Sequence, residues 1–95
     1  MRPYEITFIV RPDVESDALA VVVDKVKGLV TGGGGQVVEV NSWGRRHLAY
    51  PIDKMTEGQY VLVRAQLPAQ MLSELERDLR LTEQILRFLV VRADE

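Results

Sequence analysis

Side chains able to carry out acid–base or nucleophilic chemistry are few in this chain and lie far apart in its sequence. The single histidine, His47, follows Arg46, there is no cysteine, and Ser16, Ser42 and Ser73 fall in separate segments. Such chemistry needs an activated group beside an orienting partner. A lone histidine beside an arginine is more typical of a surface or nucleic-acid contact. We therefore predict that the chain is not an enzyme, with no catalytic residue, metal site or cofactor.

The glycine tract Gly32–Gly35 could suggest a phosphate-binding loop. A Walker-type loop, however, follows a strand and opens a helix with Lys-Ser or Lys-Thr. In this chain a helical pattern precedes the glycines and a strand pattern follows them. The tract is therefore predicted to end a helix and to form a turn.

The segment from Trp43 to Ile52 concentrates the chemistry that the rest of the chain lacks. It reads Trp-Gly-Arg-Arg-His-Leu-Ala-Tyr-Pro-Ile. Guanidinium groups bind phosphate in a bidentate manner, and aromatic rings stack on unpaired bases. Arginines also discourage an edge strand from pairing with another chain, and in that case Trp43 only covers the core. On residue types alone, the RNA-contact and edge-strand interpretations stay equally open.

The elements that must position this segment follow from hydrophobic periodicity. The first strand alternates, and its apolar face is formed by Tyr4, Ile6, Phe8 and Val10. A helix with valines on its apolar side follows, and packing must hold it because valine is a poor helix former. The expected elements are a strand at 3–11, a helix ending at Gly32, strands at 36–50 and 60–67, a helix from Pro68, and a strand at 85–92.

Several residues predict how these elements begin, bend and end. Asp13 or Ser16 is expected to cap the first helix. Gly44 is expected to mark a bulge or kink in the second strand, and Pro51 to place that strand at a sheet edge. The residues 53–58 are expected to form a polar turn.

The order strand, helix, strand, strand, helix, strand predicts an α+β fold of the ferredoxin-like βαββαβ plan, with a four-stranded antiparallel sheet. Both helices are expected on one face of the sheet, so the other face stays open. Apolar side chains that alternate onto that open face suggest a protein partner. They are Ile9, Tyr60, Leu62, Leu89 and Val91.

The composition favours a single intracellular domain. The chain has 95 residues, of which 46% are hydrophobic, which is enough for a core and argues against disorder. The absence of cysteine excludes disulfides and the usual structural zinc sites. We expect one domain at 1–92, a short free tail at 93–95, no signal peptide, no membrane span and a cytoplasmic location.

The distribution of charge matters more than its sum. A formal net charge of −2 argues mildly against a nucleic-acid partner. Half of the 14 acidic residues, however, fall in the expected helical stretches, whereas Arg45, Arg46 and Lys54 cluster with only Asp53 among them. A local basic stripe determines phosphate contacts, so RNA binding stays open.

Four segments together resemble a known family. They are residues 1–5 (Met-Arg-Pro-Tyr-Glu), residues 43–52, residues 57–60 (Glu-Gly-Gln-Tyr) and residues 81–87 (Leu-Thr-Glu-Gln-Ile-Leu-Arg). In order and spacing they are similar to small-subunit ribosomal protein six of bacteria, over about residues 1–92. The resemblance implies a ferredoxin-like fold and a ribosome-bound structural role. It also implies binding to the central domain of small-subunit ribosomal RNA, together with ribosomal protein eighteen, during assembly of the platform.

The resemblance and side-chain chemistry together nominate two sets of residues. The expected RNA contacts are Arg2, Arg45, Arg46, Lys54 and Arg87. The expected contacts with the partner or the RNA are Trp43, Tyr50, Tyr60, Leu62 and Leu89. His47 departs from the family pattern, in which a basic or polar residue is common at this position. We also expect no contact that depends on the extended C-terminal tail of some members.

Two other functions fit the same fold plan. A ligand-sensing or oligomerising module would use the open sheet face and form a stable homodimer. A small acylphosphatase-like hydrolase would need an arginine anion cradle after the first strand. The segment Arg11-Pro12-Asp13 is short and acidic for such a cradle.

Overall fold

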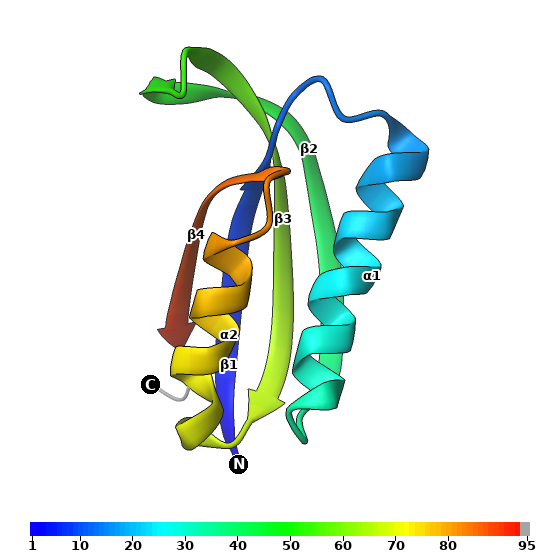
Figure 1. The fold of residues 1–95 in the computed structure, drawn as a ribbon, viewed down its shortest axis with the longest axis vertical. Coiled ribbons are helices and arrows are strands. Elements are labelled where there is room, and N and C mark those ends of the chain that lie inside the picture. The colour runs from blue at the N-terminus through cyan, green and yellow to red at the C-terminus, as the bar shows by residue number, and fades with distance from the viewer. Residues whose placement is uncertain (94–95) are drawn as a thin grey trace.

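A computed structural model of the protein describes residues 1–93, and these residues form one mixed sheet-and-helix domain. Figure 1 shows its elements in chain order. They are β1 (Arg2–Val10), α1 (Ser16–Gly32), β2 (Gln36–Ile52), β3 (Met55–Leu67), a short 3₁₀ turn (Ala69–Met71), α2 (Leu72–Arg80) and β4 (Ile85–Arg92).

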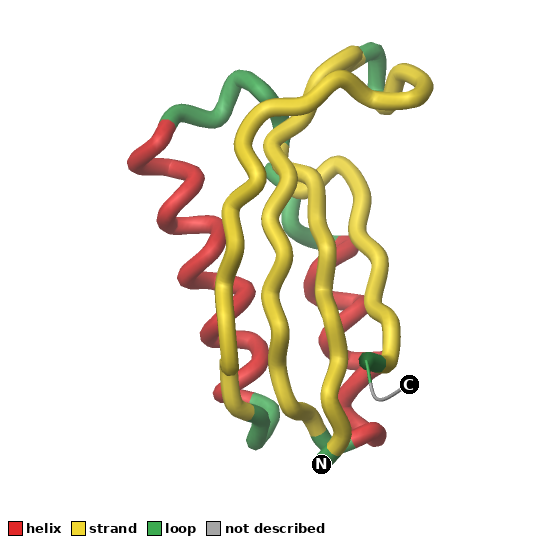
Figure 2. The backbone as a smooth tube through the Cα atoms, turned by 180° about the vertical axis from the view of Figure 1, so that it is seen from behind, coloured by secondary structure: helices red, strands yellow, loops and turns green. Residues whose placement is uncertain are grey.

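The strands form a single sheet in the order β2-β3-β1-β4, with every neighbouring pair antiparallel. Both helices lie on the same face of this sheet, and the opposite face carries no helix (Figure 1 and Figure 2). This arrangement confirms the predicted ferredoxin-like plan and the edge position of β2. Within the part of the chain that the structure describes, no helix is long and apolar enough to span a bilayer.

The core lies between the sheet and the two helices. The predicted apolar face of β1 supplies four of its residues, and Phe8 is fully buried. Apolar residues of β3, α1 and α2 pack against this face; among them are Val61, Val63, Val22, Val26, Val30, Leu75 and Leu79. The valine-rich helix α1 is therefore held by tertiary packing, in agreement with the weak helix propensity of valine.

The start of α1 differs from the expectation. The helix begins at Ser16 with Glu15 at the N-cap position, and no side chain caps it, so the prediction of a cap at Asp13 or Ser16 was wrong. Asp13 instead lies 3.5 Å from the Arg11 guanidinium. The Asp13 carboxylate therefore pairs with Arg11 in the loop between β1 and α1 instead of accepting a hydrogen bond from the first amides of the helix.

The β2–β3 hairpin is longer than predicted. Its turn consists of Asp53 and Lys54, whose φ values are 49° and 66°, and Ile52 pairs directly with Met55. Positive φ at both central residues is the geometry of a tight turn that matches the twist of paired strands. The residues 55–58, expected in a polar turn, therefore extend β3. In both ribbon views the hairpin leans across the end of the sheet toward β4 (Figure 1 and Figure 2).

Two glycines permit this bend. Gly44 has φ of 82° at a register shift between β2 and β3, which confirms the predicted kink. Gly58 lies where β3 passes over β1, and a Cβ atom there would come within 2.3 Å of the Ile9 side chain. Ile9 is buried at 9% exposure, so it cannot easily move aside. The hairpin thus covers part of the sheet face that was expected to be open.

Replacing Gly58 with alanine is expected to lower the free energy of unfolding by about 1–3 kcal/mol, because the added methyl group overpacks against Ile9. Urea denaturation measures this effect. Gly28→Ala in α1 is the matched control, because a Cβ there meets nothing within 4 Å. That control is expected to gain roughly 0.5–1 kcal/mol from the lower backbone entropy of the unfolded chain. Equal stability of the two variants would contradict the close approach.

The C-terminal end is attached as far as the structure describes it. The backbone N–H of Ala93 donates a 2.9 Å hydrogen bond to the Pro3 carbonyl, so Ala93 is not part of a free tail. The predicted tail residues 94–95 lie outside the described residues.

Candidate nucleic-acid interface

The bend of the hairpin brings basic residues from distant parts of the sequence to one end of the molecule. Arg45 and Arg46 lie on β2, and Lys54 lies in the turn. Arg87 on β4 donates a hydrogen bond to the Tyr50 hydroxyl, and its guanidinium carbon lies 5.3 Å from the centre of the Tyr50 ring. Four of the five predicted RNA contacts therefore lie on the hairpin or on the part of β4 that it touches, although Arg45 and Arg46 point to opposite faces of β2.

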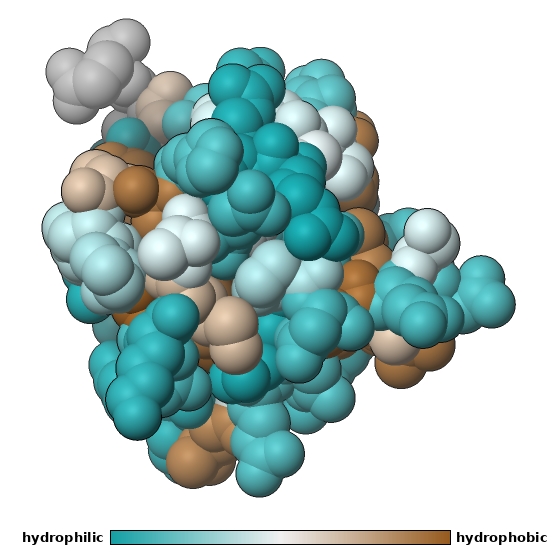
Figure 3. All heavy atoms as spheres, turned by 90° about the horizontal axis from the view of Figure 1, so that it is seen from above, coloured by the Kyte–Doolittle hydropathy of each residue, from teal (hydrophilic) through white to brown (hydrophobic). Residues whose placement is uncertain are grey.

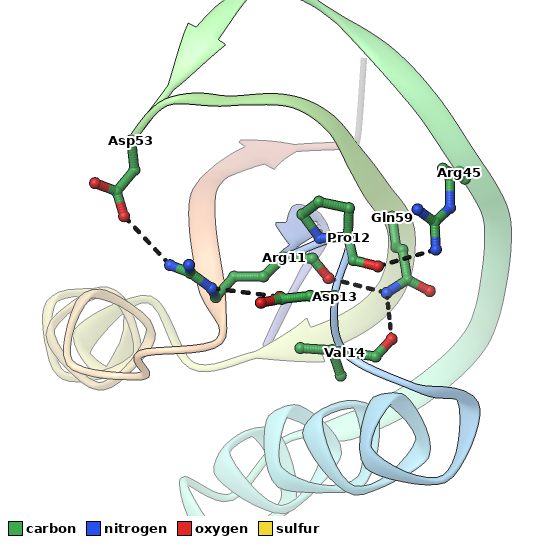
Figure 4. Close-up of polar contacts among 7 residues, drawn as sticks. All are labelled: Arg11, Pro12, Asp13, Val14, Arg45, Asp53 and Gln59. Carbon is green, nitrogen blue, oxygen red and sulfur yellow. Dashed lines mark hydrogen bonds and ion pairs between the residues drawn. The ribbon is translucent and has the colours of Figure 1, made fainter.

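A set of hydrogen bonds fixes the hairpin to the loop between β1 and α1 (Figure 4). The Gln59 side-chain amide donates to the carbonyl oxygens of Arg11 and Val14, at 3.0 and 2.8 Å. Arg45 Nη2 donates to the Pro12 carbonyl at 2.9 Å. These bonds satisfy three loop carbonyls that have turned away from the sheet ladder. The basic end of the hairpin is thus pre-positioned rather than loose.

The turn itself is held by a further ion pair. Arg11 Nη1 lies 3.2 Å from Asp53 Oδ2 (Figure 4). Asp53 is the acidic residue among the cations of the hairpin, and Arg11 partly neutralises its charge. Neither Gln59 nor Arg11 was recognised from the sequence, because their partners are set by the bend and not by local spacing.

The basic residues of this end differ in how much of their charge is already engaged. Arg45 has the Pro12 carbonyl and the Glu57 carboxylate, 3.5 Å away, as partners. His47 also lies near Glu57, at 3.7 Å, with its side chain 86% exposed. Within residues 1–93, Arg46 and Lys54 have no carboxylate partner, and both are exposed. Arg46 and Lys54 are thus the cations best able to take a phosphate.

Aromatic residues lie beside these cations. The Trp43 and Tyr60 rings stack with centroids 6.3 Å apart and an angle of 13° between their planes. Trp43 remains 47% exposed and Tyr50 53% exposed. Large aromatic rings this exposed are uncommon on a protein surface and often mark a contact site. Trp43 does not merely cover the core, which was the alternative from the sequence.

Two of the predicted site residues are separated from this cluster. Arg2 pairs with Leu67, whereas Arg87 pairs with Ile9. Seven residues along β1 separate these positions, or about 23 Å at the usual rise of a strand. Arg2 therefore lies at the opposite end of the sheet and cannot share one phosphate with the hairpin.

The open sheet face is less apolar than predicted. Leu62 is only 8% exposed, because it lies on an inner strand between Asn41 and Thr7, so little of its side chain is available for the expected contact with the partner or the RNA. Leu89 and Val91 lie on the edge strand β4 and are 62% and 46% exposed. Edge strands leave side chains uncovered on one flank, which accounts for the difference.

A row of charges crosses the same face and was not recognised from the sequence. Arg64 lies 3.3 Å from Glu5 and 3.6 Å from Glu39, which follow from the pairing of the three strands. The sheet face therefore has two parts. The hairpin end is basic and aromatic, and the far end carries this row of two carboxylates around one arginine. Viewed from the hairpin end, hydrophilic side chains cover most of the molecule, with smaller hydrophobic patches between them (Figure 3).

The arrangement suits ionic and stacking contacts rather than bond-making chemistry. Among the described residues, no group of histidine and carboxylate side chains is placed to hold a metal ion. The groups that the site does offer are guanidinium and ammonium donors beside exposed rings. Such groups bind phosphate and unpaired bases.

Comparisons with known proteins agree with this geometry. The family model for ribosomal protein S6 matches residues 3–92. Small ribosomal subunit protein bS6 of Moorella thermoacetica is 42% identical over 95 residues, which cover 100% of this chain and 97% of that protein. The bS6 protein of Heliobacterium modesticaldum is 44% identical over 95 residues, which cover 100% and 99%. The crystal structure of 30S ribosomal protein S6 from Thermotoga maritima matches with a TM-score of 0.92 at 33% identity, covering 97% of this chain and 87% of that one.

Proposed function

This chain belongs to the ribosomal protein S6 family, whose members are structural proteins of the small ribosomal subunit, and from that premise we propose where and what it binds. The proposal is that it binds the central domain of small-subunit ribosomal RNA together with ribosomal protein eighteen. In this role it supports assembly of the platform.

The observation that carries the proposal is the group of cations at the hairpin end. Arg46 and Lys54 lie on the hairpin, Arg87 lies against the exposed Tyr50 ring, and none of the three has a carboxylate partner within residues 1–93. Phosphates are their natural partners, because cations that neutralise phosphates release the counterions condensed on the RNA. Arg45 supports the same surface from its position against the loop, and Arg2 is a separate phosphate contact at the far end.

The protein partner is proposed to bind the sheet face that carries no helix. Leu89 and Val91 are exposed there, and the carboxylates of Glu5 and Glu39 lie nearby. A basic partner protein complements this mixed apolar and acidic surface, whereas RNA complements the hairpin end. Tyr60 lies between the two regions. The RNA and the partner protein would then meet at Tyr60, so binding of either one increases the affinity of this chain for the other.

The test is a binding titration against a central-domain RNA fragment, with and without ribosomal protein eighteen, at two salt concentrations. We expect tight binding only when the partner is present, with an affinity that falls steeply as salt rises. Arg2→Gln, which removes one charge about 23 Å from the hairpin along β1, tests the separate contact. Binding that does not depend on salt would contradict the phosphate assignment. A stable homodimer that binds neither RNA nor partner would favour the oligomerising module instead.

A further inference from the structure

We propose that Trp43 forms a stacking site for one unpaired RNA base, with the Tyr60 ring as its support. The inference rests on the proposed function and specifies the ligand for one part of the interface. An unpaired base needs an exposed ring face that is already held in place, and a cation within reach of its phosphate. The hairpin end supplies each of these.

The backbone places the Trp43 ring. A register shift lies between Ser42 and Gly44, and the left-handed conformation of Gly44 turns the strand at this point. Gly44 pairs with Tyr60 and has no side chain, so the space over the Tyr60 ring is free for its neighbour. The Trp43 ring lies next to that space, nearly parallel to the Tyr60 ring and offset from it, with an angle of 13° between the planes and centroids 6.3 Å apart. The bulge thus brings the Trp43 ring into contact with the ring that lies opposite Gly44.

The ring pair is held in place by its neighbours in the sheet. Tyr60 lies on an inner strand, paired with Gly44 on one side and Ile9 on the other, and is half-buried. Trp43 packs against Tyr60 and is still 47% exposed, so part of its ring remains accessible to a ligand. A ring held in this way loses little conformational freedom when a base stacks on it. An RNA base that stacks on Trp43 would add a third ring, parallel to the other two.

Charge on the surrounding surface favours a base over an apolar protein side chain. Arg46 pairs with Gly58, two residues from Tyr60, so strand alternation places it on the face of Tyr60. Arg87 lies in the same cross-strand row as Tyr60, through Ile9. Within residues 1–93 neither arginine has a carboxylate partner, and both lie on the same sheet face as Tyr60. A nucleotide satisfies both features at once, because its base stacks while its phosphates meet the arginines.

The test uses the fact that Trp43 is the only tryptophan of the chain. Its intrinsic fluorescence reports directly on the proposed site. On addition of the central-domain RNA fragment with ribosomal protein eighteen, we expect fluorescence to be quenched by the RNA and not by the partner protein alone. Trp43→Phe is expected to bind nearly as well as the parent, because it keeps a ring.

Trp43→Leu is expected to lose about 5- to 100-fold in affinity, because leucine keeps an apolar contact but has no ring to stack on. Val21→Ala is the matched control: it shortens an exposed apolar residue on α1, away from both proposed interfaces, and is expected to leave the RNA affinity unchanged. Thermal unfolding of each variant checks its fold. Parent-like RNA affinity of Trp43→Leu, or quenching by the partner protein alone, would overturn the stacking site and leave the proposed function standing. Failure of the parent protein to bind RNA in any combination would overturn both.

Discussion

Replacing Phe8 with alanine is expected to lower the free energy of unfolding by about 3–5 kcal/mol, the largest stability effect of any variant considered for this protein. Phe8 is fully buried and pairs with Val61 on one side and Phe88 on the other, so its ring lies at the centre of the core face of the sheet. Domains of this size are stable by about 5–15 kcal/mol, so the variant would be close to unfolding at growth temperatures. Urea denaturation followed by circular dichroism measures the change.

The control for this prediction is an exposed apolar residue. Leu81 ends α2 and is 71% exposed, so Leu81→Ala is expected to change stability by no more than about 0.5 kcal/mol. Phe8→Leu is an intermediate case, because it keeps most of the buried volume. If Phe8→Ala and Leu81→Ala had the same effect, the centre of the core would not lie where the structure places it.

The order of elements could be predicted from the sequence because their hydrophobic periods are regular. Tyr4, Ile6, Phe8 and Val10 alternate without interruption, and their burial follows that alternation. Gly44 and Pro51 also had the predicted consequences, a kink and an edge position, because both act through their own backbone geometry. Predictions of this kind depend only on neighbouring residues.

The side-chain contacts that hold the hairpin in place could not be predicted in this way. The contact between Arg87 and Tyr50, and the bonds from Gln59 to Arg11 and Val14, join residues more than thirty positions apart in the sequence. These contacts exist because the hairpin bends over the end of β1. Its turn is formed by Asp53 and Lys54, whose φ values are positive, a conformation that residues other than glycine rarely adopt. The burial of Leu62 could not be predicted for the same reason, since it depends on side chains of the two neighbouring strands.

Local charge, rather than net charge, explains how a chain with a formal charge of −2 can bind RNA. The acidic residues at the tip of the hairpin have partners within the protein: Asp53 pairs with Arg11, and Glu57 lies near Arg45 and His47. Their fields are therefore partly cancelled where phosphates must approach, while Arg46 and Lys54 remain free of carboxylates within residues 1–93. Internal ion pairs thus leave an excess of positive charge at one end of an acidic protein.

The largest effect on binding is expected when Arg46, Lys54 and Arg87 are all replaced with glutamine. Each phosphate contact contributes about 0.7–0.9 to the slope of log affinity against log salt, so the slope should fall by about 2–3. At 0.1 M salt this corresponds to a loss of roughly 100-fold in affinity for the central-domain RNA. Filter binding or fluorescence anisotropy across a salt series, with the partner protein present, measures both quantities.

Two single variants show whether contact or position is responsible. Arg45→Gln removes the donor to the Pro12 carbonyl, so it should weaken binding by loosening the hairpin and leave the salt slope nearly unchanged. Arg77→Gln removes the same charge from α2, on the helix-covered side, and should leave both the affinity and the slope as they are. If the triple variant lost affinity with an unchanged slope, its three residues would act on the shape of the site and not on phosphate. A slope that fell equally for Arg77→Gln would mean that RNA responds to the overall charge of the protein, and the hairpin would have no special part in binding.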